Sequence, residues 1–193
     1  MALTGILALW SCVPKANAFD PHQAFAKGAW ALSVEGGYGE QVNLGDATIT
    51  ELDFFNAGLR LGFFPWGIGG PGPLAGALEI GVEPLYQRFF DPVDAYFAGL
   101  AAVTRYHFTS LGRVVPYLEI AGSAGYTDLR VREQDTNFVF LLFGGVGASY
   151  FVTERTSIYA GYRFQHISNA GIDSPNRGID SHTGVFGLSM FFR

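Results

Sequence analysis

Residues 156–168 read TSIYAGYRFQHIS, and the rest of the chain can be interpreted outward from this run. Apolar side chains alternate in it with polar or small ones. Successive side chains of a strand point to opposite faces, so such alternation is typical of a β-strand with two different surroundings. His166 and Ser168 continue the apolar side. The apolar face comprises Ile158, Ala160, Tyr162 and Phe164, and the opposite face comprises Ser157, Gly161, Arg163 and Gln165.

The composition favours β-structure with an apolar exterior. Of the 193 residues, 49% are hydrophobic, 16% are aromatic and only 15% are charged, which is well below the quarter or so typical of soluble domains. No apolar run approaches the ~20 residues of a membrane helix. The length fits one domain.

Alternating segments of this kind recur along the chain, and turn-rich stretches separate them. Each segment is long enough for a membrane-spanning strand of about 9–11 residues, and their number is even, as in outer-membrane barrels. We therefore expect eight strands, near residues 28–39, 50–64, 76–88, 94–108, 114–127, 137–152, 156–168 and 181–192.

The polarity of the two faces indicates which barrel to expect. A soluble sandwich or a lipocalin-like barrel needs many charges outside, and this chain has too few. With the apolar face toward lipid, three arginines can pair with four glutamates in a small lumen, and closure leaves no strand edge unpaired in lipid. The expected fold is all-β, an eight-stranded antiparallel transmembrane β-barrel. Lipid-facing residues include Trp30, Leu32, Val34, Leu59, Leu61, Ile80, Val82, Leu118 and Ile120, and lumenal ones Glu35, Arg60, Glu79, Glu83, Arg105, Glu119 and Arg163.

The first 18 residues read as a secretory signal peptide, which leaves 19–193 as the barrel. Leu3 to Val13 is apolar, and Ala16-Asn17-Ala18 is an A-x-A-like cleavage site. The missing basic residue at the start departs from the pattern, and a lipoprotein acylated on Cys12 is an alternative that Trp10 fits badly. Cleavage would remove the only cysteine and leave 11 Lys+Arg against 17 Asp+Glu. That acidic balance argues against nucleic acid as a partner.

Three polar residues of the C-terminal strands are expected to meet on the outer wall. Asp180 and His182 are at even-numbered positions, as are the lipid-facing residues of the last strand, so their side chains should point to the same face. Opposed residues of an antiparallel pair also lie on the same side of a sheet. Ser168, His166 and Asp180 supply a nucleophile, a base and an acid that orients the base. For His182 we favour a place in the girdle of aromatic residues that is expected at the membrane interface of such a barrel.

The segment HISNAGI at 166–172, followed by PNRGID at 175–180, resembles the active site of the PagL-type lipid A 3-O-deacylases. These are eight-stranded outer-membrane esterases. The likeness extends upstream to Phe138-Val139-Phe140 and Gly144-Gly145-Val146-Gly147, and the C-terminal third carries most of it. The resemblance implies an outer-membrane location with the site on the outer-leaflet side and lipid A, or lipopolysaccharide, as substrate.

The resemblance also implies the roles of the residues. His166 would be the base and Ser168 the nucleophile, without a metal or a cofactor. Asp180 stands where the family usually has Glu, so its bond to His166 needs a closer backbone or is weaker. Asn176 and the backbone N–H of Gly171 match oxyanion-stabilising positions, and Asn169 matches the motif in a less defined role. Two alternatives stay open: a non-enzymatic barrel with a structural or adhesion role, and acyl transfer to another acceptor. A homodimer is also left open.

Overall fold

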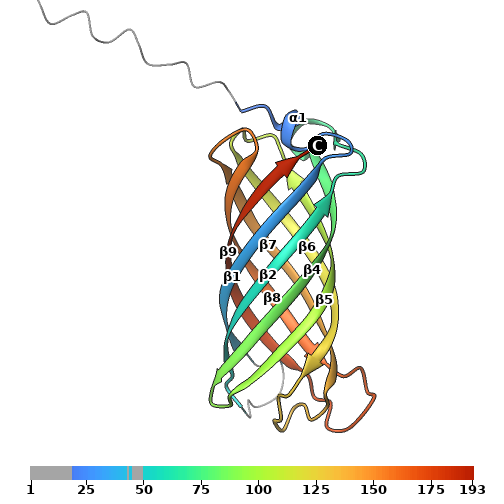
Figure 1. Cartoon of the computed structure of the whole chain (residues 1–193), viewed down its shortest axis with the longest axis vertical. Helices are drawn as coiled ribbons and strands as arrows, with labels where there is room; N and C mark the ends of the chain where they lie inside the picture. The colour runs from blue at the N-terminus through green and yellow to red at the C-terminus, as the bar shows by residue number, and fades with distance from the viewer. Residues whose placement is uncertain (1–18, 43, 45–49) are drawn as a thin grey trace, which may run out of the picture.

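The computed structural model describes residues 19–42, 44 and 50–193. Within them, eight long antiparallel strands close into a barrel (Figure 1). Closure comes from β1, which pairs with both β2 and β9, and from the pairing of β2 with β4. The strands are β1 (Trp30–Val42), β2 (Asp53–Phe63), β4 (Gly76–Asp91), β5 (Ala95–Phe108), β6 (Val114–Thr127), β7 (Phe138–Phe151), β8 (Thr156–Ser168) and β9 (Ile179–Phe192).

Three short elements complete the described chain. The two-residue strand β3 (Ile68–Gly69) pairs with β4, and the 3-10 helix η1 (Gly72–Leu74) follows it. Helix α1 (Pro21–Ala24), which the alternation did not predict, is preceded by the cap residue Asp20, whose side chain accepts the His22 N–H. No helix in the described part of the chain is long and apolar enough to cross a membrane. The expected signal peptide, with Cys12, lies outside the described residues.

The predicted faces are confirmed. Large apolar side chains cover the outside, where Val34 is 54% exposed and Ile120 is 67% exposed, as a surface in contact with lipid requires. The lumenal arginines and glutamates are buried and paired: Arg105 Nη2 lies 2.7 Å from Glu119 Oε2, and Arg60 Nη1 lies 3.1 Å from Glu83 Oε2. The expected three arginines and four glutamates therefore form a buried ionic network.

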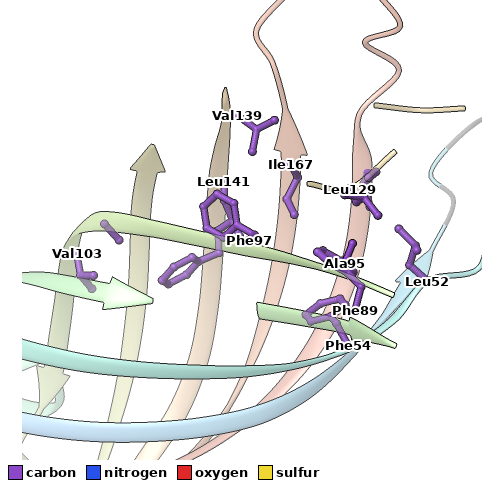
Figure 2. Packing of buried hydrophobic residues seen from close by; sticks show 13 residues of the cluster. Leu52, Phe54, Phe89, Ala95, Phe97, Val103, Leu129, Val139, Leu141 and Ile167 are labelled. Atoms are coloured by element: carbon purple, nitrogen blue, oxygen red, sulfur yellow. The ribbon is translucent and has the colours of Figure 1, made fainter. Parts of the chain in front are cut away.

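An apolar cluster fills the interior at each end of this network. One cluster lies at the same end as the connection after β8 and includes Leu52, Leu129, Ile167 and Ile179 (Figure 2). The other contains Phe25, which follows α1 and packs on Phe64, Phe151 and Phe191. Helix α1 and the C-terminus lie together at this second end, opposite the connection after β8 (Figure 1).

Candidate active site

The ends of β8 and β9 present polar side chains on the outer wall of the barrel. Along β8, His166 and Ser168 are partly exposed, whereas Ile167 between them is 3% exposed and packs in the interior cluster. Along β9, Ile179 is buried in the same cluster and Asp180 points out. Because Ile167 and Ile179 are directly paired, their burial fixes the outward direction of the neighbouring polar residues.

His166 and Asp180 are joined by a hydrogen bond across the two strands. They are direct cross-strand partners, and His166 Nδ1 lies 2.7 Å from Asp180 Oδ1. An ionised carboxylate only accepts hydrogen bonds, so Nδ1 is the donor and Nε2 is left to accept a proton. The side chains are 41% and 25% exposed, which leaves the pair accessible from the lipid side.

Ser168 lies on the same face but is not bonded to His166. No hydrogen bond to its hydroxyl occurs among the described residues. Two residues along a strand span about 6.6 Å, so the two side chains have to lean toward each other to meet. The structure therefore joins His166 and Asp180 and places Ser168 on the same face without a hydrogen bond to either.

Gly178 provides the surface on which the His166 ring rests, a contact that the sequence pattern did not predict. Its φ of +77° lies in the left-handed region, and a Cβ built on it would stand 2.5 Å from His166 Cε1. A side chain at this position would displace the ring. The only signal in the sequence was the glycine of the segment PNRGID, which was also compatible with an ordinary turn.

Asn169 organises the connection between β8 and β9. It is fully buried, and its Nδ2 donates to the carbonyls of Asp173 at 2.9 Å and Pro175 at 3.3 Å. Its Oδ1 accepts the Gly171 N–H at 2.9 Å, so that N–H already has a partner. The backbone N–H of Asn169 donates to Asn176 Oδ1 at 3.0 Å, which leaves Nδ2 as the free donor of the Asn176 amide.

His182 takes part in a separate contact. Its Nδ1 is hydrogen-bonded to the Tyr162 hydroxyl, and its ring lies 5.7 Å from that of Phe164. It therefore belongs to the outer aromatic surface below the His166–Asp180 pair.

A family model described as lipid A 3-O-deacylase (PagL) matches residues 53–189 of the sequence. The chain belongs to the PagL family. This confirms the resemblance, and residues 53–189 contain the His166, Ser168 and Asp180 positions. Among solved structures, the chain is similar to the outer membrane enzyme PagL, with a TM-score of 0.61, 20% identity, and coverage of 81% of this chain and 97% of the other.

A neisserial surface protein, NspA, is equally similar in fold. Its TM-score is 0.61 at 17% identity, over 86% of this chain and all of NspA. No curated protein matches the sequence. At these identities the two structures show a shared barrel, and the family model shows the family. The PagL family and this fold place the chain in the outer membrane, as predicted.

In this PagL-family barrel, an apolar hollow of about 370 Å³ opens on the outer wall beside the site. Phe140 and Leu142 form its near side, and they are the direct cross-strand partners of Ser168 and His166. The small outward-facing residues Ala102, Gly122 and Ala124 form its floor and leave the wall recessed. Ala101 and Ser123, whose side chains are buried on the inner face, complete the lining.

Proposed function

We propose that this chain is a lipid A 3-O-deacylase, a serine esterase that hydrolyses the 3-O-linked hydroxyacyl chain of lipid A in the outer leaflet. The observation that carries the proposal is the 2.7 Å bond between His166 and Asp180 on the lipid-facing wall, with Ser168 on the same face. An oriented base beside a hydroxyl, reached from the lipid side, suits an ester of a membrane lipid.

In the first half of the reaction, Ser168 Oγ attacks the ester carbonyl carbon and His166 Nε2 takes the hydroxyl proton. Asp180 holds the imidazolium that forms. When the tetrahedral intermediate collapses, the bond to the sugar oxygen breaks and that oxygen takes the proton from His166. The Ser168 hydroxyl has to turn toward Nε2 for this step, and catalytic hydrogen bonds often tighten only when substrate is bound.

In the second half, water attacks the acyl-enzyme and gives a proton to His166. The bond to Ser168 then breaks, and the proton returns to Oγ. The products are a free 3-hydroxy fatty acid and lipid A with a free hydroxyl. The same groups would serve acyl transfer if another acceptor took the place of water.

Asn176 is the residue to which we assign oxyanion stabilisation. Its Oδ1 is engaged by the Asn169 N–H, so its Nδ2 is the end that can donate to the oxyanion. The Gly171 N–H would first have to leave Asn169 Oδ1. One donor of this kind typically contributes about 10²–10³-fold to kcat.

The outer hollow is the surface that we assign to the scissile acyl chain. It begins at the cross-strand neighbours of Ser168 and His166, and its walls are largely apolar. An acyl chain lying there would bring its carbonyl carbon to the Ser168 hydroxyl.

Mass spectrometry of lipid A from cells that express the wild type, Ser168→Ala or His166→Asn tests the proposal. The wild type should remove one 3-hydroxyacyl group, and both variants should form heat-modifiable barrels but leave lipid A intact. Ser174→Ala, in the exposed connection after β8, is the control and should act like the wild type. Removal of the acyl group by Ser168→Ala at the wild-type rate would refute the nucleophile. Intact lipid A with a folded wild type would favour the non-enzymatic barrel.

A further inference from the structure

Glu133 is a buried acidic residue that the proposed reaction does not use. It lies in the connection between β6 and β7, at the same end of the barrel as the site, and it is 4% exposed. A buried carboxylate is costly unless its oxygens are hydrogen-bonded, so its partners indicate what it does.

The side chain of Glu133 is bonded to the wall of the barrel. Its Oε1 accepts from Gln41 Nε2 of β1 at 3.2 Å, and its Oε2 accepts from Thr50 Oγ1 at 2.8 Å. Gln41 is in turn fixed to Leu52, by a backbone bond of 2.7 Å and through its Oε1 at 3.2 Å. Leu52 is fully buried in the interior cluster (Figure 2). One carboxylate oxygen is therefore held by a side chain anchored in the barrel, and the other by Thr50 in the connection that leads into β2.

The backbone around Glu133 is bonded to the connection that carries Asn176. The Glu133 carbonyl accepts the N–H of Arg177 at 3.0 Å, and Gln134 and Asn176 form an isolated antiparallel bridge. Gln134 and Val131 exchange backbone hydrogen bonds, which close the turn that presents this edge. The connections after β6 and after β8 thus lie side by side at the end opposite α1 (Figure 1).

We propose that Glu133 is a positioning residue that holds Asn176 in place for the reaction. Its side chain fixes the β6–β7 connection to β1, and its backbone fixes the Asn176 segment to that connection. The bonds to Arg177 N–H and to Asn176 hold the segment on both sides of the Asn176 side chain, so a shift of the segment would move the Asn176 amide away from the oxyanion. This inference rests on the proposed role of Asn176.

A double-mutant cycle tests the coupling between Glu133 and Asn176. Glu133→Ala should lower kcat by roughly tenfold or more, less than the 10²–10³-fold loss expected for Asn176→Ala, with KM nearly unchanged. In the Asn176→Ala background, Glu133→Ala should have almost no further effect, because residues that act through one group are not additive. Glu133→Gln keeps an acceptor for Gln41 and should recover most of the activity.

Glu40→Ala is the matched control, because Glu40 is an exposed glutamate of β1 next to Gln41. It should keep the wild-type kcat. Rates are normalised to the heat-modifiable, folded fraction on gels, so that a loss of folding is not counted as a loss of turnover. If Glu133→Ala yields no folded barrel, Thr50→Val takes its place in the same cycle, since it removes one bond to the carboxylate. An unchanged kcat, or an equal loss in both backgrounds, would overturn the proposal.

Amide hydrogen exchange over residues 169–178 provides a readout that does not depend on the reaction. Faster exchange of this segment in Glu133→Ala, with unchanged exchange in β8 and in Glu40→Ala, is expected. Unchanged exchange of the segment would overturn the positioning role even if the deacylase activity is found. If the wild type releases no acyl group, the proposed function fails, and exchange alone still decides whether Glu133 holds the segment.

Discussion

Asp180 has one methylene fewer than the glutamate that the resemblance to the PagL-type active site implies at this position, and the strand register lets the shorter side chain reach His166. His166 and Asp180 oppose each other directly across β8 and β9. Directly opposed residues have Cβ atoms about 4.5–5.5 Å apart, a distance that a short carboxylate and an imidazole can close. The resulting 2.7 Å bond shows that the shorter acid reaches its partner without distortion of the strands.

The role of Asp180 is tested by substitution. In a measured serine triad, loss of the acid lowers kcat by about 3 × 10⁴ and loss of the nucleophile by about 2 × 10⁶. We therefore expect Asp180→Ala to lower turnover strongly but to retain more activity than Ser168→Ala. Asp180→Glu should stay active without a gain, because the short acid already makes the bond. Release of 3-hydroxy acid from lipopolysaccharide in detergent measures all three. Wild-type turnover in Asp180→Ala would leave a His–Ser dyad.

At Gly178 the absence of a Cβ atom leaves room for the His166 ring. In Gly178→Ala, the new methyl group would meet the His166 ring in a backbone conformation that side chains rarely adopt. We expect a loss of turnover of about tenfold or more, since misplacement of a reacting group by about 1 Å can cost a hundredfold. Gly112→Ala is the control, because Gly112 has a similar φ of +66° and open space around it. Equal activities of the two variants in the release assay would contradict this role for Gly178.

At the scale of elements, alternation predicted the strands well and the connections poorly. The predicted strands at 156–168 and 114–127 coincide with β8 and β6. The strand predicted at residues 28–39 is observed as β1, which extends from Trp30 to Val42. Its C-terminal end was missed because glycines there obscure the alternation, although the pairing with β9 continues to Val42.

The connections escaped prediction for a different reason. The link between Glu133 and Asn176 passes through backbone groups, and backbone groups leave no pattern in the sequence. The polar residues His166 and Asp180 could be placed together because the alternation of side chains along a strand shows which face each one is on. Gly178 and Glu133 lie in connections, where side chains do not alternate in this way.

The outer hollow, which extends from β4 to β7 beside the site, can be tested as the acyl-chain surface. Ala124→Leu should fill part of it, raise KM for the natural substrate and shift the preference toward shorter acyl chains. Ala148→Leu makes the same change on the outer face of β7 away from the hollow and should be neutral. Competition between synthetic esters of different chain length measures the shift. An unchanged preference in Ala124→Leu would place the acyl chain elsewhere.

At the scale of the whole molecule, the interior is arranged in three zones, with an ionic network between two apolar clusters. Arg163 joins Glu35 and Glu119 in the network, and its Nε lies 2.7 Å from Glu119 Oε1. Removal of one partner from a buried ion pair is costly because it leaves an uncompensated charge. The network therefore ties β8, which carries the site, to β1 and β6.

We expect Arg163→Met to lower the free energy of unfolding by roughly 3–5 kcal/mol. The gel shift of the heat-modifiable barrel in a urea series measures it. Arg177→Met, at an exposed arginine of the β8–β9 connection, should leave the urea midpoint within the error of the measurement. A midpoint for Arg163→Met equal to that of the wild type would mean that the remaining arginines neutralise the glutamates.

The outward direction of His166, Ser168 and Asp180 has a kinetic consequence. A site on the outer wall meets its substrate by sideways diffusion within a leaflet, a two-dimensional encounter. The variable that sets the rate is then the mole fraction of lipid A among the surrounding amphiphiles, and its bulk molarity is irrelevant. In mixed micelles, added detergent should slow turnover by surface dilution even though enzyme and substrate concentrations per litre stay the same.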